Sequence, residues 1–165
     1  MSTILNTNGD ALQVPALDKN VKGKFYVVTA TWNSDVTDVL GHGALQVIRE
    51  AGVAEENIKS LKVPGTVELV NVAAMLVKKP DTAAVIVIGC VIRGDTPHFD
   101  YVCQIAAQGV ASINSLGNAP VIFGVLTVDN LAQAMERAGG SLGNKGAEAA
   151  SAAISMANIH SRFAH

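Results

Sequence analysis

The chain has 165 residues, of which 49% are hydrophobic and 16% are charged, and its formal net charge is −2. This length suits one domain with a full core, and the sequence has no basic run beyond Lys78-Lys79, which argues against a nucleic-acid-binding protein. The apolar run 83–92 is too short to span a bilayer and residues 1–20 lack a secretory-signal pattern, so we expect a cytoplasmic protein without membrane contact.

Taken in chain order, the elements alternate between strands and helices. Residues 1–20 hold no long periodic segment and are expected to form an arm that is ordered only where it docks, ahead of a single domain over 21–165. The remaining elements follow from hydrophobic period, caps, Gly and Pro. They are strands over 24–31, 58–63, 83–92 and 120–127, and helices over 34–51, 66–79, 97–116, 129–138 and 146–163.

Three local details accompany these elements. Asn33 or Ser34 is expected to cap the helix over 34–51. Ile105 is expected on the inner face of the helix over 97–116. A compact glycine-rich turn over 139–143 separates the last two helices.

This alternation predicts an α/β fold in which a four-stranded parallel sheet is covered on both faces, a three-layer α/β/α sandwich. The last helix is rich in alanine, which suits either a tight core or a close subunit interface. The high apolar content also favours a homo-oligomer with buried interfaces, although a dense core explains it almost as well.

The segment that follows the third strand carries the strongest chemical signal. It reads Gly89-Cys90-Val91-Ile92-Arg93-Gly94-Asp95-Thr96-Pro97-His98. Ligands bind at the carboxyl edge of a parallel sheet, and the free N–H groups at a helix start favour an anion. A histidine on the same turn can move protons near neutral pH. The segment therefore predicts an anion cradle beside an acid/base group.

Other loops and strands at this edge offer further candidates, each with a structural alternative. Trp32 suits either stacking on a planar ring or capping of the core. Glu68 suits either bonding to sugar hydroxyls or a helix-dipole contact. Phe123, taken alone, reads as core packing.

The remaining polar and thiol side chains leave similar choices. Arg137 is a phosphate clamp or a favourable cation at a helix end, and Lys145 is a solvated loop charge or a second electrostatic partner. Cys90 and Cys103 match no metal or redox spacing and read as buried reduced thiols. We treat the other histidines as surface or packing residues: His42, His160 and His165.

Together these segments resemble the 6,7-dimethyl-8-ribityllumazine synthase family. The resemblance rests on the 89–100 segment, on Pro120-Val121-Ile122-Phe123-Gly124-Val125-Leu126-Thr127, on 133–139 and on Gly143-Asn144-Lys145-Gly146. It runs from about residue 24 to residue 163 with all elements in the family's order. It implies a flavodoxin-like fold and a transferase of riboflavin biosynthesis.

The resemblance also implies the reaction and the roles of single residues. The small-molecule substrates are 5-amino-6-(D-ribitylamino)uracil and 3,4-dihydroxy-2-butanone 4-phosphate, which condense without a cofactor or a metal. His98 is the implied proton-transfer residue. Those implied for the pyrimidine and its ribityl chain are Trp32, often phenylalanine in the family, with Thr66, Val67, Glu68, Cys90, Val91, Ile92 and a neighbour's Phe123. Those implied for the butanone phosphate are Asp95, Thr96, Arg137 and Lys145.

The family further implies a pentamer with active sites between subunits. Some members assemble twelve pentamers into an icosahedral capsid, and the short 139–143 turn favours that shell here. Riboflavin synthase is the implied protein partner. The alternative function is a flavin-binding or cage-forming homologue with little catalysis.

Overall fold

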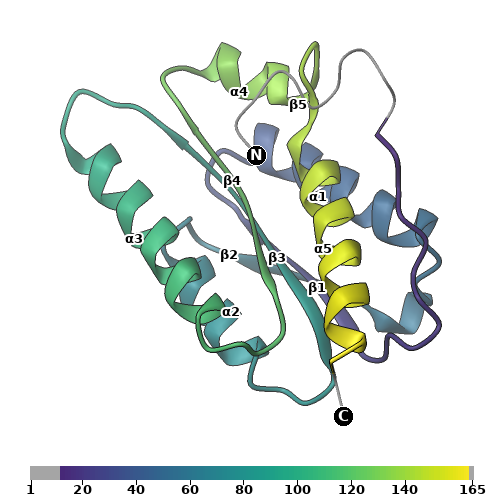
Figure 1. Cartoon of the computed structure of the whole chain (residues 1–165). Coiled ribbons are helices and arrows are strands. Elements are labelled where there is room, and N and C mark those ends of the chain that lie inside the picture. Colours follow the sequence, from purple (N-terminus) through teal and green to yellow (C-terminus); the bar gives the residue numbers. More distant parts are fainter. Residues whose placement is uncertain (1–11, 164–165) are drawn as a thin grey trace.

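Four parallel strands form the central sheet, in the order β2-β1-β3-β4 (Figure 1). The structure is a computed structural model that describes residues 12–163. Its strands are β1 (Lys24–Ala30), β2 (Ile58–Val63), β3 (Thr82–Ile92), β4 (Val121–Val128), β5 (Ala138–Gly140) and β6 (Gly143–Asn144). Its helices are α1 (Ser34–Glu50), the 3₁₀ turn η2 (Glu55–Asn57), α2 (Glu68–Leu76), α3 (His98–Asn114), α4 (Leu131–Arg137) and α5 (Lys145–Ser161).

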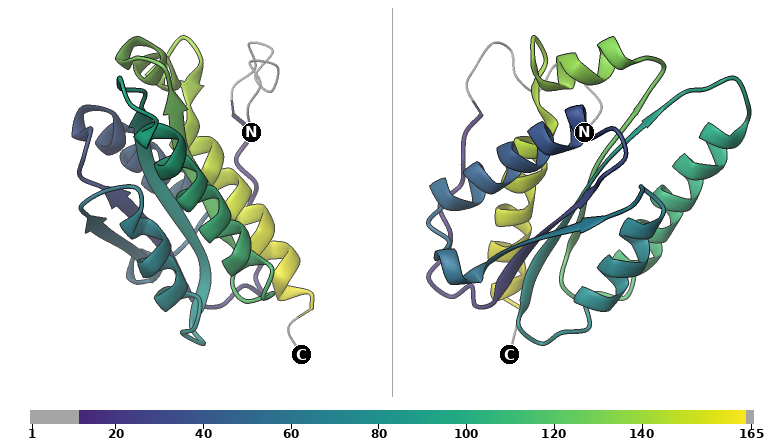
Figure 2. Two further views of the ribbon diagram at one scale, coloured as in Figure 1. Left: turned by 90° about the vertical axis from the view of Figure 1, so that its left-hand side faces the viewer. Right: turned by 180° about the vertical axis from the view of Figure 1, so that it is seen from behind.

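Helices cover both faces of the sheet, which confirms the predicted three-layer α/β/α sandwich (Figure 2). The side chains of strand β1 alternate between the two covered faces. Phe25 and Val27 point into a core shared with α1 and α5. Tyr26, Val28 and Ala30 point into a second core shared with α2 and α3. Successive side chains of a strand face opposite sides, so a nearly all-apolar strand is buried on both faces.

Helix α5 packs very closely on α1. A Cβ at Gly146 would lie 2.0 Å from the carbonyl oxygen of Leu40, so only glycine fits there. Four of the six alanines of α5 are buried in the core: Ala149, Ala150, Ala153 and Ala157. For these four the core interpretation is confirmed.

Several expected boundaries are wrong by one to three residues. The largest difference is in α2, which ends at Leu76 and not at residue 79. The carbonyl oxygen of Leu76 accepts a hydrogen bond from Thr82 Oγ1 at this helix end. Asn144 caps α5 by accepting from the Ala147 N–H. The expected glycine turn is flanked by a two-stranded antiparallel ladder, β5-β6, with Gly139 and Gly143 at positive φ.

The prediction that Ile105 lies on the inner face of its helix is also wrong. It is 48% exposed on α3, whose buried residues are Ala106, Val110 and Ile113. The apolar stripe of this helix is wider than the face that the sheet covers.

The described part of the expected arm lies against α5. The Asn158 side chain accepts from the Asp18 N–H at 2.8 Å and donates to the Ala16 carbonyl at 3.0 Å. Val14 and Leu17 pack on the core. Residues 1–11 of the arm lie outside the described residues.

Candidate active site

The carboxyl ends of the four parallel strands meet at one edge, where α4 also lies (Figure 1). Backbone bonds continue past the strand ends. The Trp32 N–H donates to the Pro64 carbonyl at 3.1 Å, and the Arg93 N–H donates to the Val128 carbonyl at 2.9 Å. These bonds hold in place the loops that carry the candidate residues.

Asn33 fixes the turn after β1 in an unexpected way. It occupies the N-cap position of α1, but its side chain makes no capping bond. Instead its Nδ2 donates to the carbonyl of Cys90 at 2.8 Å, and its φ is 59°, in the left-handed region. The expected side-chain cap is therefore wrong, because the amide bridges β1 to the end of β3. Asparagine adopts this region more readily than other residues except glycine.

Trp32 and Glu68 meet over Gly65. Trp32 is 67% exposed, which excludes its core interpretation. A Cβ at position 65 would lie 2.7 Å from atoms Cε3 and Cζ3 of the indole and 2.9 Å from Oε2 of Glu68. Glycine thus lets a flat aromatic surface and a carboxylate approach the same point of backbone. An exposed aromatic face beside a carboxylate can stack on a planar ring while the carboxylate accepts hydrogen bonds.

Thr66 and Cys90 lie deeper at the same edge. Thr66 is 6% exposed, and its Oγ1 lies 2.8 Å from the position of a Cβ on Gly89. Cys90 is buried, and burial raises the pKa of its thiol to about 11. A thiol that stays protonated near neutral pH is a poor nucleophile. Cys103 is a half-buried free thiol.

The other residues predicted to contact the pyrimidine from α2 and β3 are less deeply buried than Thr66 and Cys90. Val67, Val91 and Ile92 are half-buried. The structure therefore brings the pyrimidine candidates of β1, α2 and β3 to one edge.

The loop that follows β3 is open to solvent. Asp95, Thr96 and His98 are all exposed, and His98 is the first residue of α3. The Asp95 carboxylate is thus free to face water, which leaves the backbone N–H groups of the helix start available to an anion.

Arg137 lies at the end of α4. It is 30% exposed, and its Nη1 donates to the carbonyl of Gln133 at 2.9 Å. Its nearest carboxylate is that of Glu136, 4.0 Å away. Most of its donors remain available to a ligand.

Lys145 differs from the solvated loop charge considered for it. It begins α5, and its ammonium lies 2.7 Å from the carboxylate of Glu148. The two side chains are only 14% and 8% exposed. The charge of Lys145 is therefore already balanced within the chain.

Phe123 does not lie beside Trp32 in the same subunit. It pairs with Val87 in the sheet, and Val87 pairs with Val28, several strand positions before Trp32. At 36% exposed on the edge strand it is not a core residue either.

Three residues that shape the candidate site were not recognised from the sequence. Gly65 and the bridging role of Asn33 depend on neighbours distant in sequence. Arg93 lies within the 89–98 segment, where the sequence suggests no role for it, yet it contacts both Asp100 and Asp129. A charge placed directly after a buried strand is the signal that identifies it.

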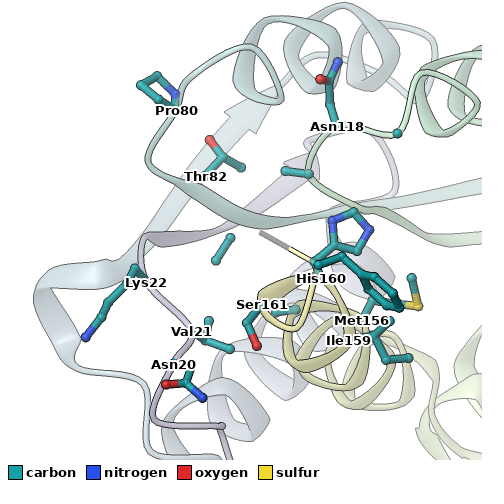
Figure 3. A pocket seen from close by; sticks show the side chains of 15 residues that line it. Asn20, Val21, Lys22, Pro80, Thr82, Asn118, Met156, Ile159, His160 and Ser161 are labelled. Atoms are coloured by element: carbon teal, nitrogen blue, oxygen red, sulfur yellow. The ribbon is translucent and has the colours of Figure 1, made fainter. Parts of the chain in front are cut away.

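A pocket lies at the opposite, amino-terminal edge of the sheet (Figure 3). Lys22, Thr82, Asn118 and His160 are among its lining residues, and none of the predicted site residues lines it. The side chain of His160 is half-buried, and that of His42 is exposed. His165 lies outside the described residues.

Two kinds of feature are absent from residues 12–163. No cluster of His, Cys, Asp and Glu there is arranged to hold a metal ion. No helix in the same range is both long and apolar enough to cross a membrane.

The chain is similar in sequence to proteins of known name. The family model described as 6,7-dimethyl-8-ribityllumazine synthase matches residues 22–161. A protein of that name from Porphyromonas gingivalis is 50% identical over 133 residues, 81% of this chain and 83% of the relative. One from Bacteroides fragilis is 49% identical, covering 81% and 93%, and one from Cytophaga hutchinsonii is 46% identical, covering 87% and 89%. The chain therefore belongs to the 6,7-dimethyl-8-ribityllumazine synthase family.

Proposed function

We propose that the chain catalyses the reaction of its family. It is a transferase that condenses 5-amino-6-(D-ribitylamino)uracil with 3,4-dihydroxy-2-butanone 4-phosphate. The products are 6,7-dimethyl-8-ribityllumazine, phosphate and water, in riboflavin biosynthesis. The observation that carries this proposal is that the family match over residues 22–161 includes every residue predicted for the site.

The pyrimidine substrate is assigned to the edge formed by Trp32, Glu68 and Thr66. The exposed indole offers a stacking surface, and the neighbouring carboxylate can accept hydrogen bonds from ribityl hydroxyls. Val67, Cys90, Val91 and Ile92 complete this wall. The space above Gly65 supports this assignment, because the indole and the carboxylate both lie next to it.

The butanone phosphate is assigned to the loop that holds Asp95 and Thr96, with Arg137. Backbone N–H groups at the start of α3 and a guanidinium with free donors suit a phosphate that must bind and then leave. Lys145 adds long-range positive charge only weakly, because Glu148 balances it.

The chemistry needs proton transfers and no electron acceptor. The substrate amine attacks the ketone, water leaves to give an imine, phosphate is eliminated, and the second amine closes the ring on the remaining carbonyl group with loss of a second water. We assign the proton shuttle to His98, at the start of α3. The amine is already nucleophilic, so proximity and orientation supply much of the rate.

A homo-oligomer follows from the same assignment. Phe123 lies on the edge strand β4, several strand positions from Trp32 of its own subunit, and we assign it to the site of an adjacent one. Large apolar side chains are exposed on α3 and α4, such as Tyr101 at 63%, Ile105 at 48% and Met135 at 45%. These exposures support a pentamer, and the short 139–143 connection supports a shell of twelve pentamers. Riboflavin synthase as a partner and a cytoplasmic location stay predictions.

A turnover assay with both substrates tests the function. The full-length protein should form 6,7-dimethyl-8-ribityllumazine, followed by its absorbance, with equimolar phosphate release. Omitting either substrate is the control. A folded, assembled protein that binds flavin-type rings but forms no product would instead be the flavin-binding or cage-forming homologue.

A further inference from the structure

Arg93 closes the loop that carries the candidate phosphate cradle. Its Nη2 lies 3.3 Å from Oδ1 of Asp100 on α3, and its guanidinium carbon lies 4.1 Å from the centroid of the Phe99 ring. Its own backbone is fixed to β4 through the Val128 carbonyl. The side chain thus connects the end of β3 to the first turn of α3, and the 94–97 loop and His98 lie between these two points in the sequence.

The same guanidinium reaches the loop that precedes α4. Its Nε lies 3.3 Å from Oδ1 of Asp129. The Asp129 N–H donates to the side-chain oxygen of Gln133 at 2.9 Å, and the Gln133 carbonyl accepts from Arg137 Nη1 at 2.9 Å. A continuous set of polar contacts therefore connects the loop before His98 with Arg137.

The positive charge of Arg93 also neutralises two nearby carboxylates. Asp100 and Asp129 would place two carboxylates beside a site that must accept a phosphate, and Arg93 contacts both. The three side chains are 46%, 50% and 67% exposed, so these ion pairs add little to folding stability. The contacts are better explained by what they do to the local field and to the loop.

We propose that Arg93 is a positioning residue for the phosphate-bearing substrate. It neutralises Asp100 and Asp129 and holds the 94–97 loop against the helix that carries Arg137, without contacting the phosphate itself. The assignment of the phosphate site is taken from the proposed function.

Steady-state kinetics of Arg93→Met test this assignment. Uncovering the two carboxylates should raise the KM for the butanone phosphate about tenfold and leave the KM for the pyrimidine unchanged. Arg93→Lys should lie in between, because an ammonium keeps one charge but does not fork between two carboxylates. The matched control is Arg49→Met, which breaks an equally exposed pair with Glu55 far from this edge.

A rescue experiment tests the charge effect of Asp100 and Asp129. Adding Asp100→Asn and Asp129→Asn to Arg93→Met should lower the KM for the butanone phosphate again, because neutral amides need no counter-charge, although the 94–97 loop stays unheld. If the triple variant stays as impaired as Arg93→Met, the two carboxylates do not act on the phosphate site and the proposal is overturned. An unchanged KM for the butanone phosphate in Arg93→Met also overturns the proposal. If the methionine variant does not fold, the same outcome in Arg93→Lys overturns it.

Calorimetric binding of inorganic phosphate gives a readout that does not depend on turnover. Arg93→Met should bind phosphate about tenfold more weakly than the unmodified protein and than Arg49→Met. Equal binding in all three, or none in the unmodified protein, overturns the proposal even if turnover is normal. Weakened phosphate binding in a protein that forms no product would instead count against the proposed function alone.

Discussion

His98 stands exposed at the first position of α3, beside a loop whose backbone is held at both ends. We expect His98→Ala to slow turnover by about 10²-fold or less, because acid/base assistance is one contribution beside proximity. His42→Ala, a change at an exposed histidine of α1, is the control. Complete loss of turnover in a folded His98→Ala protein would contradict this limited role.

Arg137 keeps most of its donors free, since it gives only one bond to its own helix. We expect Arg137→Ala to raise the KM for the butanone phosphate about ten- to a hundredfold, as for a lost charged hydrogen bond. Arg162→Ala, at an exposed arginine beyond α5, should have no effect. An unchanged KM for the phosphate substrate in Arg137→Ala would remove the arginine from the site.

Trp32 is the single tryptophan of the chain, so its fluorescence reports on this edge alone. Its large exposed surface should bind flavin-type rings, and we expect riboflavin to quench it in a titration. Trp32→Ala should weaken binding about tenfold, followed by the fluorescence of riboflavin itself. A flat titration of the unmodified protein would disprove the hypothesis.

Between elements, glycines decide how closely the helices and loops approach. Gly146 of α5 meets the backbone of α1, and Gly65 meets the ring of Trp32. The first contact involves backbone that cannot rotate away, whereas the second involves a side chain on the surface. Their loss should therefore have different consequences, one for stability and the other for binding.

Gly146→Ala should lower the free energy of unfolding by about 3 kcal/mol, because the added methyl group forces α5 away from Leu40. Ser155→Ala, at an exposed position of the same helix, is the control. Thermal and urea unfolding of both variants measures the effect. Equal stability would mean that α1 and α5 separate more easily than their buried alanine contacts indicate.

At the scale of the whole molecule, the exposed apolar face of α3 is the feature that a lone subunit leaves uncovered. We expect Ile105→Asp to break the assembly into smaller species and to abolish most turnover, because Phe123 would no longer reach a neighbouring site. Light scattering gives the mass, and the neighbouring exposed change Gln104→Asp is the control. A fully active, monomeric Ile105→Asp protein would place the complete site within one subunit.

The sequence by itself determined the order of elements and the sheet. Alternation of period-2 and period-3.6 segments leaves little choice but a parallel sheet covered on both faces, and the 58–63 strand was predicted with its exact bounds. The strand ends then identified the edge where a site must lie.

Only the tertiary structure decided which side chains meet there. Asn33 reads locally as a helix cap, and its amide turns to Cys90 because β3 ends beside it. Lys145 reads as a loop charge, and Glu148 covers it one helical turn away. Arg93 shows no partner in sequence, yet Asp100 and Asp129 both reach it. Local pattern fixes a residue's element, whereas hydrogen bonds and ion pairs depend on distances between elements that only packing sets.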